Sequence, residues 1–131
     1  MEGKKHLIFK EIQYKSQGEL RIAKFLTQLN IKFEYEFPIA VKHDNKVSIW
    51  YPDFYLKEFQ IVVEFFGYKG GSENYDKGIE YKKKVYGECG IECIGMEKLH
   101  KFWIQELTNQ IIKTIENKKI ELNYKFKGIK K

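Results

Sequence analysis

The sequence predicts one α/β domain of 131 residues, in which a mixed sheet of about four strands is flanked by helices. Three observations lead to this prediction. Ile61–Phe66 is an uninterrupted apolar run, typical of a strand covered on both faces. Val47–Leu56, just before it, is rich in aromatic and β-branched residues. A helical pattern over Tyr75–Cys89 leads into the short apolar segment Ile91–Ile94, and a helical crossover of this kind joins parallel strands.

The composition favours a folded protein with a basic C-terminal tail. Hydrophobic residues make up 43% of the chain and aromatic residues 16%, which argues against disorder. The net charge is +6, but residues 118–131 hold six lysines against Glu121, so the rest of the chain carries only about +1. No apolar run approaches the roughly 18 residues of a membrane span, and the N-terminus does not resemble a signal peptide. We therefore expect a soluble, cytoplasmic protein with no membrane partner.

The first third of the chain predicts a helix and a strand. Residues 1–15 fit either a short strand or an ordered arm. Ser16–Glu19 has the S-x-x-E pattern of a capping box, which opens a helix that is expected to run to about Asn30. Closing this capping box is one explanation for Glu19, which projects close to the apolar side of the helix. Ile31–Ala40 alternates aromatic and charged residues, as a half-exposed strand does, and a turn is expected over residues 43–46.

Two carboxylates stand out in the central hairpin. If Lys57–Gln60 form a four-residue loop, Leu56 faces Ile61, and counting along the ladder places Asp53 opposite Glu64. Like charges in this position repel, and an unpaired carboxylate is costly to bury. A divalent cation is the simplest reason for such a pair, and oxygen-only ligation with room for water suits Mg²⁺ or Mn²⁺.

The helix predicted over Tyr75–Cys89 carries a lysine in an unusual position. Lys82 falls in the middle of its apolar stripe, whereas Lys83 and Lys84 point increasingly toward solvent. A lysine there either covers apolar surface with its stem or reaches an anionic partner. Gly90 is expected to end this helix.

The remaining segments carry fewer functional signals. Glu97–Asn117 predicts a long amphipathic helix whose apolar stripe belongs to the core, although its length leaves a homodimer contact open. Residues 118–131 suggest a basic edge strand or an arm. Cys89 and Cys93 are expected to be buried free thiols, because a zinc site needs more ligands. Gly67–Asn74 is expected to be a mobile loop beside the carboxylates, since its glycines match no phosphate-binding motif.

The motifs YPDF at Tyr51–Phe54 and VVEFFG at Val62–Gly67 resemble a known family when taken with the residues around them. Gly18-Glu19 precede them, and a lysine-rich helix ending in a Gly-Ile strand follows. This ordered set, covering about Tyr14 to Met96, resembles the PD-(D/E)xK, or restriction-endonuclease-like, nuclease superfamily in a compact form with E-φ-φ-G in place of E-x-K. The resemblance implies a core in the order α-β-β-β-α-β, extended here by a C-terminal helix and a basic tail.

The resemblance also implies a metal-dependent nuclease and assigns roles to residues. Asp53, Glu64 and the carbonyl of Phe65 would bind Mg²⁺, with Mn²⁺ as a substitute, and Glu19 would add a further ligand, in competition with its capping role. The E-x-K lysine would stand at residue 66, where this chain has phenylalanine, so Lys82 is the expected replacement and Lys69 the alternative.

Nucleic acid, DNA rather than RNA, is the expected substrate. The alternative reading is a catalytically inactive nucleic-acid-binding or assembly module on the same fold. Contacts to the nucleic-acid backbone are expected from Lys69, Lys118, Lys119, Lys125, Lys127, Lys130 and Lys131.

Overall fold

A computed structural model describes residues 7–67 and 73–129 of the chain, together with the side chains of residues 7–67 and 77–119. Most of the loop predicted over Gly67–Asn74 therefore lies outside the described residues, as do residues 1–6 of the predicted N-terminal arm. None of the helices in the described part is both long and apolar enough to cross a membrane.

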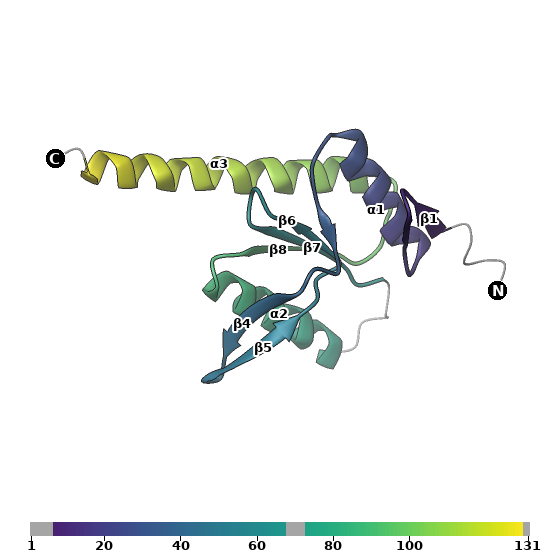
Figure 1. The fold of residues 1–131 in the computed structure, drawn as a ribbon, viewed down its shortest axis with the longest axis horizontal. Coiled ribbons are helices and arrows are strands. Elements are labelled where there is room, and N and C mark those ends of the chain that lie inside the picture. The colour runs from purple at the N-terminus through teal and green to yellow at the C-terminus, as the bar shows by residue number, and fades with distance from the viewer. Residues whose placement is uncertain (1–6, 68–72, 130–131) are drawn as a thin grey trace.

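The central sheet has four strands in the order β3-β6-β7-β8 (Figure 1). Strands β3 (Glu34–Tyr35), β6 (Phe54–Leu56) and β7 (Ile61–Phe65) are antiparallel, and β8 (Glu92–Met96) runs parallel to β7. The predicted α/β class, the mixed four-stranded sheet and the helical crossover before its parallel strand are confirmed. The four buried residues at the start of β7 also confirm that this strand is covered on both faces.

Three helices cover the sheet. The helices α1 (Gln17–Gln28) and α3 (Trp103–Ile129) pack against one face, and α2 (Glu73–Glu88) packs against the other (Figure 1). Two groups of buried side chains result from this layering. One lies between the sheet, α1 and α3, and includes Leu26, Phe54, Val63 and Leu107. The other lies between the sheet and α2, and includes Val62, Val85, Tyr86 and Cys93.

A separate hairpin interrupts two predicted strands. Strands β4 (Ile39–His43) and β5 (Lys46–Trp50) pair only with each other, and the two-residue turn between them has positive φ angles of 50° and 60°. The prediction of one continuous strand over Val47–Leu56 is therefore wrong, and the strand predicted within Ile31–Ala40, which was expected to end at Pro38, is reduced to Glu34–Tyr35. A proline interrupts each of these segments, and proline has no N–H to donate to a strand ladder.

The chain ahead of α1 forms a small hairpin. Strands β1 (Ile8–Phe9) and β2 (Ile12–Gln13) pair antiparallel beside α1. Of the two alternatives left open for residues 1–15, the described part forms short strands.

The ends of α1 and α2 follow from their sequences. The Ser16 hydroxyl accepts a hydrogen bond from the Glu19 N–H at 3.1 Å, as predicted for the cap of α1. The α2 helix ends at Gly90, which has a φ of 81°. Its N–H donates to the Gly87 carbonyl, and the Ile91 N–H donates to the Tyr86 carbonyl, which is the paired pattern of a Schellman cap.

The bounds predicted for the last helix are wrong at both ends. It begins at Trp103 rather than Glu97, and His100 Nδ1 accepts the Phe102 N–H at 3.2 Å just before its first turn. It continues to Ile129, so the described part of the basic tail is helical and is neither an edge strand nor an arm. This part of α3 extends past the sheet (Figure 1), so none of the described strands lies beside it, and extending a formed helix costs little.

Both cysteines are free thiols, as predicted. Cys93 is buried as predicted, whereas Cys89 is half-buried, so the burial predicted for Cys89 is wrong. Burial, followed by the nearby charge of Glu64, raises the pKa of the Cys93 thiol to about 12, so this sulfur is a poor nucleophile at neutral pH.

Candidate metal centre

Asp53 and Glu64 lie on adjacent antiparallel segments. The ladder pairs Leu56 with Ile61, and its continuation places Asp53, which directly precedes β6, across from Glu64 on β7. The Phe65 N–H donates to Asp53 Oδ2 at 2.7 Å, which ties this carboxylate to the strand that carries Glu64. The hairpin register predicted from the sequence is therefore confirmed.

Both carboxyl groups resist ionisation. Burial, and then the negative charge of Glu64, raises the pKa of Asp53 to about 7, although the hydrogen bond from the Phe65 N–H favours the ionised form. Burial also raises the pKa of Glu64, which is only 5% exposed, while the Lys82 ammonium opposes this effect. Ionising both groups would gather negative charge in a poorly solvated place, which is the electrostatic condition that a bound cation relieves.

Lys82 reaches this pair from α2. Its Nζ lies 3.4 Å from Glu64 Oε2, and 45% of its side chain is exposed. Buried Val85 and Tyr86 follow it on the same helix, whereas Lys83 and Lys84 are exposed. The ammonium thus lies between Glu64 and solvent, which agrees with the stripe geometry that the sequence predicts. At 3.4 Å the contact is longer than a strong charge-assisted hydrogen bond.

Phe66 lies beside Glu64, over Gly95. Glu64 pairs with Gly95 on the parallel strand β8, and a Cβ placed on Gly95 would come within 2.6 Å of the Phe66 ring. The ring therefore fills the space above a residue that has no side chain. Lys82 Nζ lies 5.8 Å from the centre of the same ring. An apolar ring thus occupies the β8 side, and positive charge reaches Glu64 from α2.

Glu19 is buried in the first turn of α1 and is held by neighbouring donors. Its Oε1 accepts the Lys15 N–H at 3.1 Å and the Tyr35 O–H at 2.5 Å. The bond to Lys15 replaces the Ser16 N–H bond of a full capping box. The charge of Glu19 also contributes to the raised pKa values of Asp53 and Glu64, so it acts on the pair electrostatically.

A close contact explains the Gly18-Glu19 motif. A Cβ on Gly18 would lie 2.3 Å from the Phe65 ring, so only glycine lets α1 begin directly against β7. This contact brings Glu19 toward the strand that carries Glu64.

Tyr35 is the site residue that the sequence reasoning missed. Burial, and then its hydrogen bond to Glu19, raises the pKa of its phenol. Its only signal in the sequence is the alternation Phe33, Tyr35, Phe37, in which it counts as one more apolar side chain.

The predicted basic contacts are only partly described. Lys118 Nζ donates to the carbonyls of Phe59 and Gln60, which joins α3 to the loop between β6 and β7. Lys119 is exposed. Lys69 and the lysine side chains beyond residue 119 lie outside the described residues.

Two further observations bound the site. Among the described side chains, no group of three or more His, Cys, Asp or Glu is placed to hold a metal ion.

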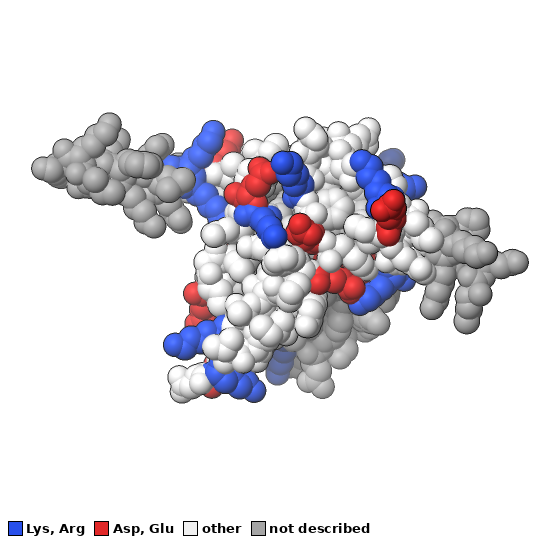
Figure 2. Space-filling view, in the orientation of Figure 1, with Lys and Arg blue, Asp and Glu red and all other residues white. Residues whose placement is uncertain are grey.

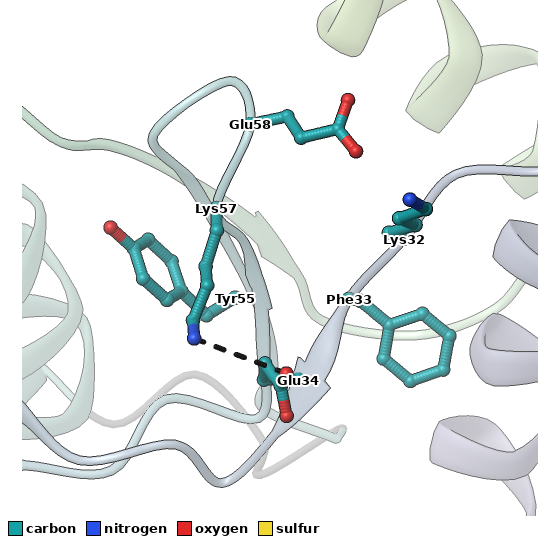
Figure 3. Close-up of a pocket in the computed structure, with 6 residues that line it drawn as sticks. All are labelled: Lys32, Phe33, Glu34, Tyr55, Lys57 and Glu58. Atoms are coloured by element: carbon teal, nitrogen blue, oxygen red, sulfur yellow. Dashed lines mark ion pairs between the residues drawn. The ribbon is translucent and has the colours of Figure 1, made fainter.

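A separate pocket of about 240 Å³ lies at the β3 edge of the sheet and is lined by Lys32, Phe33, Glu34, Tyr55, Lys57 and Glu58 (Figure 3). It is open to solvent, and Lys57 Nζ lies 3.9 Å from Glu34 Oε1 across it. The carboxylate pair and Lys82 do not line this pocket.

Comparison with known proteins gives one similar structure. No protein-family model and no curated protein sequence matches the chain. Among solved structures, the chain is similar to the homing endonuclease I-Bth0305I catalytic domain, with a TM-score of 0.43 and 19% sequence identity. The similarity covers 80% of this chain and 92% of that domain. At this TM-score and identity, the similarity assigns no role to any residue of this chain.

Proposed function

We propose that the protein is a metal-dependent nuclease that hydrolyses phosphodiester bonds of nucleic acid, with DNA as the expected substrate. The observation that carries this proposal is the adjacent pair Asp53 and Glu64, poorly solvated and with raised pKa values, with the Lys82 ammonium beside it. The motif resemblance of these residues to the PD-(D/E)xK superfamily supports the same reaction class.

The side chains present fit Mg²⁺. Mg²⁺ is commonly bound through one or two carboxylates and keeps several water ligands, so the Asp53–Glu64 pair supplies enough protein oxygen. The Phe65 carbonyl would complete the protein ligands, and Glu19 would act through a water molecule. When bound, the metal would lower the pKa of a water ligand and polarise the phosphoryl oxygen. Mn²⁺ accepts the same oxygen ligands and would substitute.

The chain's own residues position the reactants. The Phe65 N–H holds the Asp53 carboxylate in a fixed orientation, and the ladder holds Glu64 across from it. Lys82 would orient the attacking water or stabilise charge that develops on the phosphate. Lysines of residues 118–131 would hold the nucleic-acid backbone and release counterions without reading sequence.

A nucleic-acid-binding or assembly module without catalysis is the second candidate. The observation that favours it is Phe66, an apolar ring at the position where the family carries its lysine. Such a module has no need of a divalent ion at Asp53 and Glu64, so metal binding separates the two candidates.

The test is cleavage of labelled DNA and RNA in single-stranded, duplex and branched forms, with Mg²⁺, Mn²⁺ or EDTA. We expect cleavage with either metal, none in EDTA, and loss of at least about 10²-fold in Asp53→Asn and Glu64→Gln. Glu92→Gln, an exposed carboxylate on β8, is the matched control and should cleave as the wild type does. If no substrate is cleaved and Mn²⁺ does not bind, the protein is not a nuclease of this kind.

A further inference from the structure

The β4–β5 hairpin is an excursion from the central sheet. The chain leaves the sheet after Tyr35 and returns at Phe54, and the two strands between them pair only with each other. In Figure 1 the hairpin projects from the body on the side of α2. The inner face of the hairpin belongs to the core beside α2, through Ile39 and Val41, but packing in the core does not explain its outer face.

The inner face of the hairpin is fixed to α2. Val41 is fully buried, and the Trp50 ring meets the Tyr86 ring edge-to-face with centroids 5.2 Å apart. His43 Nδ1 lies 2.7 Å from the Tyr81 hydroxyl, and Tyr81 precedes Lys82 on α2. Aromatic packing and this hydrogen bond therefore hold the hairpin against the helix that supplies the site's lysine.

The outer face exposes large apolar side chains at every second position of β5. Val47 is 66% exposed, Ile49 is 52% exposed and Tyr51, just past the strand, is 62% exposed. Exposed Lys42 and Ala40 lie across from Val47 and Ile49. Figure 2 shows a largely uncharged surface over the hairpin, with basic and acidic side chains near its tip. A contiguous exposed apolar face is typical of a binding surface.

The surrounding charge favours a nucleic-acid strand as the occupant. Lys42 and Lys46 are exposed, and neither forms an ion pair within the part of the chain that the structure describes. Lysine is depleted at protein–protein interfaces, whereas aromatic and apolar side chains beside lysines suit stacked bases and their phosphates.

The hairpin face lies close to the candidate metal centre along the chain. Tyr51 precedes Asp53 by two residues, a span of at most about 7 Å of extended chain. A nucleic-acid strand that contacts Tyr51 therefore lies within reach of the carboxylate pair.

We propose that the outer face of the β4–β5 hairpin, formed by Val47, Ile49 and Tyr51 with Lys42, contacts the bases of a nucleic-acid strand whose backbone passes the Asp53–Glu64 pair. This inference rests on the proposed function, since it names the surface that presents the substrate to that site. The Tyr51 ring supplies stacking that does not depend on sequence, Val47 and Ile49 add apolar contact, and Lys42 contacts a phosphate.

The test is binding of labelled single-stranded and duplex DNA and RNA to the full chain in EDTA, where no metal-dependent cleavage occurs. We expect the triple variant Val47→Thr/Ile49→Thr/Tyr51→Ser to lose affinity about tenfold or more, and Tyr51→Phe to retain it. The matched control is Ile8→Thr/Ile12→Thr, two exposed apolar residues of another hairpin, which should bind as the wild type does. Tyr51→Ser alone, and circular dichroism of each variant, guard against an effect of misfolding.

Unchanged affinity in the folded triple variant would overturn the inference. It would also be overturned if the wild type proved to be a dimer that the triple variant converts to a monomer, because a second copy of the chain would then cover this face. The two proposals fail separately. If the triple variant loses affinity but the wild type does not cleave in Mg²⁺, only the proposed nuclease function is wrong. If the wild type cleaves but the triple variant keeps the wild-type affinity, only this inference is wrong.

Discussion

The two antiparallel hairpins on either side of Asp53 have similar composition but differ in their place relative to the central sheet and in the exposure of their side chains. The β6–β7 hairpin lies inside the sheet, and its charged Glu64 is 5% exposed. The β4–β5 hairpin lies outside the sheet, and its apolar Val47 is 66% exposed. Each hairpin thus has side chains in an unfavourable environment. In the β6–β7 hairpin this is a carboxylate in an apolar strand, and in the β4–β5 hairpin it is aliphatic groups exposed to water. We take such unfavourable environments as the signs of binding, to a cation in the first hairpin and to nucleic-acid bases in the second.

The largest expected effect is on cleavage, and it concerns Lys82, which contacts Glu64 of the β6–β7 hairpin. Lys82→Met should preserve the fold, because methionine fills similar space, and should lower cleavage at saturating substrate about 10²-fold or more. Lys83→Met and Lys84→Met are exposed matched controls on the same helix and should change little beyond modest binding. Saturating substrate separates lost chemistry from lost affinity. Activity in Lys82→Met equal to the wild type would remove it from the mechanism and leave Lys69 as the candidate.

The next effect compares the hairpins by stability, with the same substitution in each. Val62→Ala on β7, where the side chain is fully buried, should lower the free energy of unfolding by about 2 kcal/mol. Val47→Ala on β5 should change it by less than about 0.5 kcal/mol, because this side chain already meets water. Urea denaturation of both variants measures the difference. Equal losses would mean that the outer face of β5 is covered in solution.

The smallest effect concerns pH and the metal. Because the folded state raises the pKa of Asp53 to about 7, its proton must leave before a cation binds, so Mg²⁺ should bind about tenfold more weakly at pH 6 than at pH 8. Without metal, the folded state holds this proton more tightly than the unfolded chain does, so the pair's contribution to stability falls as pH rises through about 7.

Isothermal titration with Mg²⁺, and thermal unfolding with and without Mg²⁺, measure these two trends. Asp53→Asn should lose most of the pH dependence of Mg²⁺ binding and most of the pH dependence of stability. If the variant keeps the wild-type pH dependence, another group governs binding, and the pair is not the metal site.

The sequence by itself determined the elements whose signals are local. The Ser16 cap, the Gly90 helix end and the Leu56–Ile61 hairpin register each depend on a few neighbouring residues, and each is confirmed. The placement of Asp53 across from Glu64 follows from that register alone, because side chains alternate along a strand with a period of two. The approach of Lys82 to Glu64 could also be predicted from the sequence, since the period of a helix fixes which residues share its packed face.

Only the tertiary structure decided the features that depend on distant partners. Nothing local separates a strand of the central sheet from a strand of the β4–β5 ribbon, since both have β-branched and aromatic residues, and the difference lies in what packs against them. The bond between Tyr35 and Glu19 joins residues 16 positions apart and has no local signature. The helical course of the tail was likewise hidden by its alternating pattern, because a strand needs a neighbouring strand to pair with and a helix satisfies its own backbone.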